Sequence, residues 1–267
     1  MLAPDPGAIA LAFFGLFGFI FLITQYFQVV RGYDPLQAGV ATLPFAVVTG
    51  AMSPVAIGVM KRIGTKIVVA GGLVLMSAGF VVAAGVGVDS AYWGKIIVSM
   101  TLMAAGLALT SGPATDAIMG AVLPGKAGAG SAVNDTTREL GGTLGVAVVG
   151  SVLASLYGAH VLRTLTSLGA PAAAAAAAQK SVVAGLTVAA HLPPALHGLA
   201  AQAARQAFVD GLSAGSLVAA AGTAVAAVAA LAFLPARAKQ PPPGGTPAPV
   251  QTGTGGQGRS LPGIVAR

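Results

Sequence analysis

The chain has 267 residues, of which 55% are hydrophobic and 8% are charged, and its formal net charge at pH 7 is +7. About a quarter of the residues of an ordinary soluble protein are charged, so this composition excludes a soluble globular protein and requires lipid to cover the surface. The basic residues lie scattered between apolar runs rather than on one basic face, which argues against a nucleic-acid-binding protein. Zero cysteines exclude disulfides and cysteine-based metal or redox sites.

Six apolar stretches are long enough to cross a bilayer, which takes about 20 residues of helix. We predict membrane-spanning helices over residues 7–30, 36–60, 67–88, 96–119, 140–157 and 207–234. The first stretch lacks the basic start of a signal peptide and is too long for its apolar core. Pro44 and Pro54 in the second stretch are tolerated because neighbouring helices satisfy the carbonyls that they free. The expected fold is an all-α membrane protein, one bundle of six transmembrane helices.

Residues 130–157 change in polarity along the chain rather than around a helix. Asn134, Arg138 and Glu139 lie in the first part, whereas the second part carries no charge. This gradient is expected of a helix that enters a bilayer from a charged interface, since an amphipathic soluble helix keeps its polar residues on one face. Small residues permit close packing of helices in lipid. The positions expected to do so here are Gly141, Gly142, Gly145 and Gly150.

The segment 158–206, between the last two spans, is predicted to be a long loop with one or two interfacial helices. It contains an unbroken run of alanines, 172–178, and a moderately apolar piece, 181–190, of about half the length needed to cross. A seventh crossing within 172–190 is the alternative. The tail, 236–267, is rich in Pro, Gly, Thr and Gln and is expected to be disordered.

Basic residues in short loops indicate which side of the membrane each loop faces. One side carries an excess of them, at Lys61, Arg62, Lys66, Lys126 and Arg138. The short loops of the other side carry only Arg31 and Lys95, each with an aspartate close by. We therefore expect a multi-pass protein of the plasma membrane, the inner membrane of the cell, with both termini cytoplasmic and the segment 158–206 outside.

Two motifs carry a resemblance to a transporter family. The first is QYFQVVRGYDPLQAG, residues 25–39, followed by Leu43-Pro44. The second comprises Asn134, Arg138, Gly141, Gly142, Gly145 and Ala147. Together they resemble the C-terminal half of the fourteen-span drug:proton antiporters (EmrB/QacA type) of the major facilitator superfamily. The resemblance covers roughly residues 7–235. It implies a major-facilitator-type bundle and proton-coupled efflux of drugs or other amphipathic small molecules by alternating access, with lipid and protons as the other partners.

The chain departs from that family in two places. The loop with Lys61, Arg62, Gly64 and Lys66 resembles the loop that ties adjacent helices together on the cytoplasmic side, but Lys61 stands where the family has an acid. Nothing in the chain resembles the N-terminal half of the family. We therefore expect a half-transporter or truncated chain that needs a missing N-terminal half or a second copy. The alternative is a non-transporting membrane protein or assembly partner that is inactive without that half.

Polar groups inside a span cost free energy, which makes them the first candidates for function. Gln25, Tyr26 and Gln28 are candidates for lining a drug cavity, and the favoured alternative is that they form hydrogen bonds between helices, with Tyr26 as an interfacial tyrosine. Asn134, Arg138 and Glu139 are candidates for a cytoplasmic gate or latch. The alternative for Arg138 is an anchor that obeys the charge rule for loops.

Asp116, about one turn after Pro113 in the fourth span, is the candidate for proton coupling. The alternative is that Asp116 lies near the cytoplasmic end, solvated or paired with Arg138 or Lys126. The histidines have no metal-site spacing, and no catalytic triad order or phosphate-binding loop occurs. We therefore expect neither an enzyme nor an ATP-driven pump, and neither a metal nor a cofactor.

Overall fold

The computed structural model describes residues 6–121 and 127–234, and within these ranges every regular element is helical. The long helices are α1 (Pro6–Gln25), α2 (Pro35–Ile63), α3 (Thr65–Ala84), α4 (Ile97–Ala121), α5 (Ala127–Ser167) and α8 (Pro194–Phe233). Two short helices, α6 (Ala172–Ala178) and α7 (Val182–His191), follow α5. One wide π-helical turn, η1 (Tyr26–Val30), extends α1, and another, η2 (Tyr92–Ile96), precedes α4.

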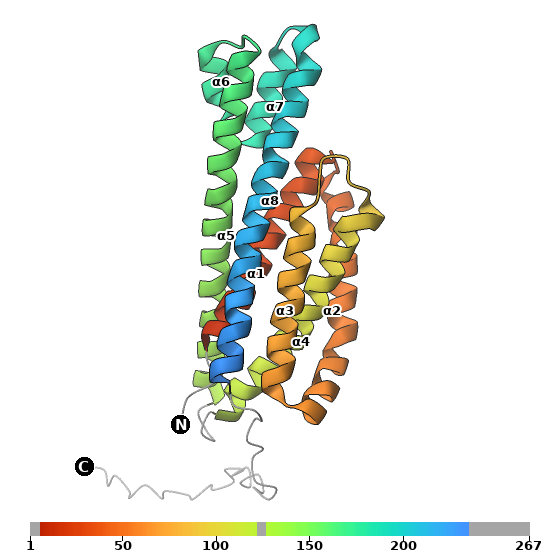
Figure 1. The fold of residues 1–267 in the computed structure, drawn as a ribbon, viewed down its shortest axis with the longest axis vertical. Coiled ribbons are helices and arrows are strands. Elements are labelled where there is room, and N and C mark those ends of the chain that lie inside the picture. Colours follow the sequence, from red (N-terminus) through yellow and green to blue (C-terminus); the bar gives the residue numbers. More distant parts are fainter. Residues whose placement is uncertain (1–5, 122–126, 235–267) are drawn as a thin grey trace, which may run out of the picture.

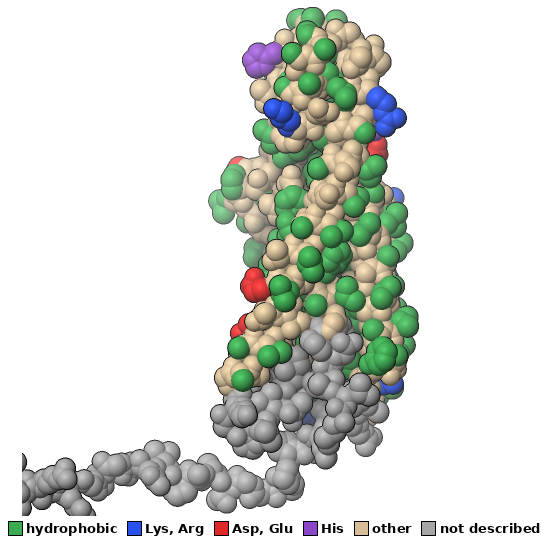
Figure 2. Space-filling view, turned by 90° about the vertical axis from the view of Figure 1, so that its left-hand side faces the viewer, with side chains coloured by type: hydrophobic (Ala, Val, Ile, Leu, Met, Phe, Trp, Pro, Cys, Tyr) green, Lys and Arg blue, Asp and Glu red, His purple; other side chains and the backbone are tan. Residues whose placement is uncertain are grey.

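Six helices are long and apolar enough to cross a membrane. They cover Ile9–Val30, Pro35–Ile63, Thr65–Ala84, Tyr92–Thr115, Gly128–Ser167 and Pro194–Phe233. The prediction of an all-α membrane protein with six spans is therefore confirmed. Large apolar side chains lie exposed along these helices, among them Leu140 and Leu144 on α5, as expected of a surface that faces lipid. Figure 2 shows such side chains along most of one face, with charged groups sparse among them.

The helices pack into one bundle in which α8 lies between α5 and α3 and also contacts α1 (Figure 1). Helix α1 lies against α5 and α8, and α3 lies against α4 and α8. Helix α2 lies on the outside and contacts mainly α4. The buried side chains come mostly from α1, α3, α4 and α8, and the largest of them include Phe27, Phe80 and Phe208.

Close approach between helices depends on glycines at two of these contacts. A Cβ built on Gly141 or Gly145 of α5 would collide with the backbone of α1, at the carbonyls of Ala10 and Phe14 respectively. Gly142 and Gly150 of the same helix face the rings of Phe17 and Phe21. The spacing of Gly141 and Gly145 is the Gly-x-x-x-Gly arrangement by which membrane helices bring their backbones together.

Helices α3 and α4 meet in the same manner. A Cβ on Gly72 would lie 2.7 Å from the carbonyl oxygen of Gly106, and a Cβ on Gly106 would collide with the carbonyl oxygen of Gly72. Because lipid is as apolar as the side chains, packing of this kind, rather than exclusion of water, holds membrane helices together.

Local sequence explains where α2 begins and ends. Asp34 accepts a hydrogen bond from the backbone N–H of Gln37 (2.7 Å), and the Gln37 side chain accepts one from the backbone N–H of Asp34 (3.2 Å). This capping box, followed by Pro35 at the first helical position, fixes the start of the helix. Gly64 ends it with a φ of +91°, a conformation that glycine adopts without steric cost.

The segment 158–206 differs from the expected loop because almost all of it is helical. Helix α5 has 41 residues and α8 has 40, so both continue well past the predicted spans 140–157 and 207–234. Their extensions pack with α6 and α7 beyond the ends of α1 to α4 (Figure 1). Alanine has the highest helix propensity, and the alanines of 172–178 and 200–207 also permit close packing of these helices. Helix α7 has ten residues, too few to cross a bilayer. The predicted tail, 236–267, lies outside the described residues.

The turn between η1 and α2 provides a first test of the backbone conformation. Gly32 has a φ of +69°, and a Cβ added to it meets nothing within 4 Å. Gly32→Ala is therefore expected to cost about 1–2 kcal/mol through backbone strain alone. Gly39 in α2 is equally open but helical, so Gly39→Ala is expected to leave stability unchanged or raise it. Thermal unfolding of the two variants in detergent measures the difference, and equal midpoints would contradict the strained turn.

Candidate functional site

A polar cluster lies at the end of the bundle where α1 and α5 begin. Arg138 of α5 donates a hydrogen bond from Nη2 to Thr115 Oγ1 of α4, over 2.9 Å. Its guanidinium also lies over the ring of Phe13 of α1, 4.8 Å from the ring centre. A cation over an aromatic face is attracted to it, more strongly where water is excluded. One side chain thus connects three helices.

Two buried polar atoms of this cluster have no hydrogen-bond partner among the described residues. They are Oδ1 of Asn134, whose side chain is 5% exposed, and Nε of Arg138. An unsatisfied buried polar atom costs about 1–3 kcal/mol, so each such atom calls for an explanation. Both are suited to make a further hydrogen bond when the helices shift or when another group enters.

Of the two carboxylates predicted near this cluster, the structure describes the side chain of Glu139 but not that of Asp116. Glu139 is exposed at the surface of α5, and its side chain makes no ion pair with another described residue. Asp116 falls within α4, directly after Thr115, but its side chain lies outside the described part of the structure. Lys126 lies outside it as well. The proton-coupling role of Asp116 and its alternative pairing with Arg138 or Lys126 therefore stay predictions.

The predicted loop with Lys61, Arg62, Gly64 and Lys66 is a tight turn at this same end of the bundle. Lys61 and Arg62 are exposed in the last turn of α2, where cations interact favourably with the helix dipole. Lys66 is half-buried in the first turn of α3, and Gly64 alone separates the two helices. The turn lies apart from the Arg138 cluster, which α1, α4 and α5 form.

The predicted cavity residues lie at the opposite end, and they do not form one surface. Tyr26 is completely buried, and its hydroxyl donates a hydrogen bond to the carbonyl oxygen of Gly87 over 2.9 Å. Gln25 is half-buried and Gln28 is exposed. The π-helical turn η1 widens the helix here, so the spacing that places residues three apart on one face of an α-helix does not apply. A cavity role for Gln25, Tyr26 and Gln28 stays a prediction.

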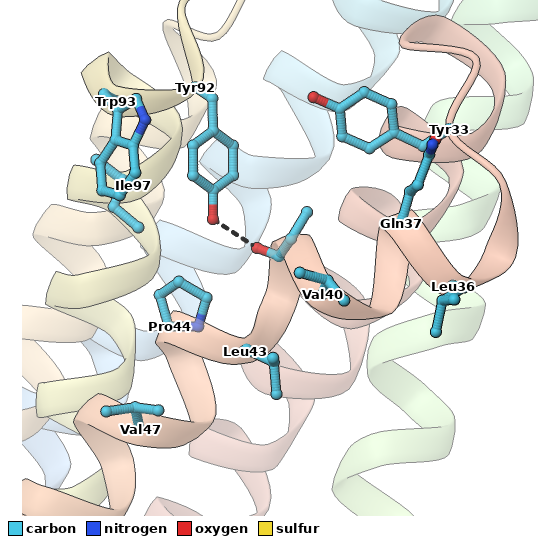
Figure 3. A pocket seen from close by; sticks show the side chains of 11 residues that line it. Tyr33, Leu36, Gln37, Val40, Leu43, Pro44, Val47, Tyr92, Trp93 and Ile97 are labelled. Atoms are coloured by element: carbon cyan, nitrogen blue, oxygen red, sulfur yellow. Dashed lines mark hydrogen bonds between the residues drawn. The ribbon is translucent and has the colours of Figure 1, made fainter.

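Sequence reasoning missed a pocket of about 1000 Å³ at this end, between the first half of α2 and the start of α4 (Figure 3). It is lined by Tyr33, Leu36, Gln37, Val40, Ala41, Leu43, Pro44, Val47, Tyr92, Trp93 and Ile97. The Tyr92 hydroxyl donates a hydrogen bond to the carbonyl oxygen of Ala41 over 2.8 Å. The signal in the sequence that could have indicated it is the pair of consecutive aromatic residues Tyr92 and Trp93.

Arg31 connects the turn after η1 with the segment between α3 and α4 at this end of the bundle. Its Nη1 donates a hydrogen bond to the carbonyl oxygen of Ser90 over 3.0 Å, and its guanidinium lies 5.9 Å from the ring centre of Tyr33. A hydrogen bond with the side chain of Tyr33 raises the pKa of Arg31, so this group is a cation at every physiological pH. The turn that carries Tyr33 is therefore tied to the connection between α3 and α4.

Among residues 6–121 and 127–234, no group of three or more His, Cys, Asp or Glu side chains lies close enough together to hold a metal ion. His160 of α5 instead pairs with Asp210 of α8, with 3.1 Å between Nδ1 and Oδ2. Asp210 also accepts a hydrogen bond from the side-chain amide of Gln206 over 2.9 Å. This surface pair joins the two long helices α5 and α8.

Comparison with characterised proteins gives a consistent set of relatives. Multidrug efflux pump LfrA of Mycolicibacterium smegmatis is 33% identical over 224 residues, which are 84% of this chain and 44% of the relative. The chain is homologous to multidrug efflux pumps. Methyl viologen resistance protein SmvA of Salmonella typhimurium is 32% identical over 73% of this chain and 38% of its own length. Multidrug resistance protein Stp of Mycobacterium tuberculosis is 33% identical over 55% of this chain and 27% of its own length.

The part of each relative that this chain matches is less than half of the relative's length. No protein-family model matches it. LfrA is an efflux pump by name, in keeping with the membrane-spanning bundle described above.

Proposed function

We propose that the chain forms one helix bundle of a secondary drug exporter, which moves amphipathic compounds out of the cell in exchange for protons by alternating access. The observation that carries this proposal is the similarity to LfrA, at 33% identity over 84% of the chain. The six apolar helices support it. The motifs at residues 25–39 and 134–147 resemble the fourteen-span antiporters of the major facilitator superfamily, which supports the finer assignment.

The working exporter, in this proposal, contains a second bundle, supplied by an N-terminal half or by a second copy. Transporters of this class bind their substrate near the bilayer midplane, between two repeated halves. Helix α2 supports a partner on its outer side. Gly39, Gly50 and Gly58 lie along it, and a Cβ added to any of them meets nothing within 4 Å. Outward-facing small residues let a second membrane helix approach closely.

The end of the bundle with Arg138 is the cytoplasmic end in this proposal, because the basic loop residues lie there. Arg138 acts as a latch that holds α5 against α1 and α4 while that end is closed. Oδ1 of Asn134 and Nε of Arg138 have no hydrogen-bond partner among the described residues, which supports this role, since both can form new hydrogen bonds when the helices part. Asp116, next in sequence to Thr115, is the group that exchanges protons.

The test is ethidium efflux from a bacterial strain that lacks its own drug exporters. The chain is produced alone, and together with the part of LfrA that the alignment leaves uncovered. We expect efflux in the presence of a second bundle, and expect it to stop when the proton gradient is collapsed. Drug-driven proton movement is then measured in proteoliposomes, and full coupling in Asp116→Asn would exclude Asp116 as the exchanging group. No efflux in either arrangement would favour the alternative, a non-transporting membrane protein.

A further inference from the structure

Three basic side chains lie together at the turn between α2 and α3 (Figure 1). Lys61 and Arg62 are exposed in the last turn of α2, and Lys66 lies in the first turn of α3. No hydrogen bond or ion pair joins any of these three side chains to another residue in the described ranges 6–121 and 127–234. The turn therefore carries three positive charges that no group in the described structure balances.

The helix dipole accounts for two of these charges but not for the third. The C-terminal end of a helix attracts cations, which suits Lys61 and Arg62 at the end of α2. The N-terminal end repels them, yet Lys66 lies half-buried in the first turn of α3, which contains no acid. A negatively charged group beside the turn would stabilise Lys66 in this position.

A hollow on the surface of α2 adjoins the turn. It has a volume of about 240 Å³ and is lined by Val55, Gly58, Val59 and Arg62. These residues follow one another at intervals of three or four and so share one face of the helix. A Cβ added to Gly58 meets nothing within 4 Å, so the missing side chain leaves the space open. Pockets for drug-sized ligands measure about 300–1000 Å³, and this smaller hollow suits the headgroup end of one lipid.

The hollow changes in polarity along α2 as a phospholipid does along its length. Arg62 lies at the end of the membrane-spanning helix, where the hydrocarbon layer gives way to headgroups. Val55 lies two turns deeper, about 10 Å along the helix axis, and its side chain is exposed. Val55 and Val59 can therefore contact an acyl chain while Arg62 contacts the phosphate above it.

We propose that this hollow, with Lys61 and Lys66 beside it, binds the phosphate of an anionic phospholipid. Phosphatidylcholine brings a cation of its own, for which the turn offers no acid. An anionic lipid brings a net negative charge, and each basic group near the membrane surface adds to its attraction. In the proposed orientation this end faces the cytoplasmic leaflet, which is rich in such lipids. Gly39 and Gly50, further along α2, stay open for a second bundle.

The chain contains no cysteine, so a fluorophore can be attached to a single introduced one. Ile63→Cys places it beside the turn, at an exposed position. The full chain is labelled and placed in nanodiscs that contain either phosphatidylglycerol or phosphatidylcholine with a spin label, which quenches the fluorophore, on the upper acyl chain. The dependence of quenching on lipid fraction gives the relative affinity of the two lipids.

We expect phosphatidylglycerol to bind beside Ile63 at least tenfold more strongly than phosphatidylcholine, since three basic groups attract it. The control is Leu36→Cys, which places the fluorophore at the other, exposed end of α2. There we expect the two lipids to quench about equally. Equal quenching by the two lipids beside Ile63 would overturn the proposal.

Variants separate the hollow from general attraction to a basic surface. Arg62→Gln and Lys66→Gln are each expected to lower the preference for phosphatidylglycerol about fivefold. Gly58→Leu keeps every charge but fills the hollow, and we expect a similar loss. Arg163→Gln removes an exposed cation from α5 and should leave the preference unchanged. A full preference in Gly58→Leu would assign it to diffuse surface charge and overturn the hollow as a site.

Inorganic phosphate is the competing source of the same anionic group. It is added to the labelled nanodiscs and compared with sodium chloride of equal ionic strength, because salt by itself weakens attraction between exposed charges. Displacement of phosphatidylglycerol by phosphate but not by chloride would assign the turn to a free ion and overturn the lipid assignment. None of these measurements requires transport, so a failure of the proposed efflux would leave the lipid site standing.

Discussion

Gly145→Leu is expected to prevent assembly of the bundle. A Cβ at Gly145 collides with the carbonyl of Phe14, and this obstacle is the backbone of α1, which has no rotamer that relieves the contact. Overpacking of a helix contact costs about 1–3 kcal/mol and more where backbone has to move. We expect a loss of about 3 kcal/mol or more from the free energy of unfolding. Thermal unfolding in detergent and the monodisperse fraction in size-exclusion chromatography measure it.

Gly50→Leu is the matched control, because Gly50 also lies within a membrane-spanning helix but meets nothing within 4 Å. Its side chain is added on the outer surface of α2, and we expect a change within about 0.5 kcal/mol. Gly145→Ala is expected to fall between the two variants, since even a methyl group meets the Phe14 carbonyl. If Gly145→Leu and Gly50→Leu unfold at the same temperature, α1 and α5 are not packed through Gly145.

Arg138→Lys is expected to lower ethidium efflux at least tenfold in the two-bundle arrangement. A lysine keeps the charge, but it cannot at once donate to Thr115 and cover the Phe13 ring as the planar guanidinium does. Loss of a hydrogen bond to a charged group costs roughly 1.5–3 kcal/mol, and about 1.4 kcal/mol corresponds to a factor of ten in rate. Initial efflux rates, normalised to the amount of chain in the membrane, give the effect.

This substitution separates the two interpretations of Arg138. An anchor that obeys the charge rule for loops needs only a positive charge, so Arg138→Lys with full efflux would refute the latch. Arg163→Gln provides the control on the same helix. Arg163 is exposed, and its Nε bonds only the carbonyl of Ala159 in its own helix, so normal efflux is expected. Thr115→Val, which removes the acceptor, should resemble Arg138→Lys.

The helices could be predicted from the sequence because the thickness of a bilayer sets the length of the apolar runs that cross it. A span needs a continuous apolar run, and the first four apolar helices long enough to cross a membrane lie within a few residues of the ranges that such runs indicate. The change in polarity along residues 130–157 was a second such mark. In the structure, the glycines that follow the charged part of α5 lie against α1.

The helical extensions could not be predicted in this way. Residues 158–206 contain no apolar run long enough to cross a bilayer, and the helices there pack through contacts between α5, α6, α7 and α8. Tyr157 is an example. It is buried by Gly185 of α7, and its hydroxyl bonds the carbonyl of Ala178 at the end of α6, over 3.3 Å. Only the tertiary fold brings these residues together.

The pocket escaped prediction for a related reason. Its walls come from the turn with Tyr33, from α2 and from η2, and none of these segments carries a periodic signal for a cavity. The prediction for Gln25 and Gln28 assumed α-helical spacing, which the π-helical turn η1 alters. The contacts of Arg138 could not be predicted either. Its partners, the apolar Phe13 and the small polar Thr115, lie in two other spans, and neither residue type indicates an arginine contact.

Helices α5 and α8 are so long that a small change of angle at one end corresponds to a large shift of the other end. A helix of 41 residues is about 60 Å long, roughly twice the thickness of the hydrocarbon layer. Helix α6 packs against α5 and α7, and α7 packs against α8, so the ends of the two long helices are joined. A tilt of about 10° at the bundle displaces its tip by on the order of 10 Å, given that length. A small change in the packing of α5 against α1 at Gly141 and Gly145 would thus be enlarged several-fold at the far end of the helix.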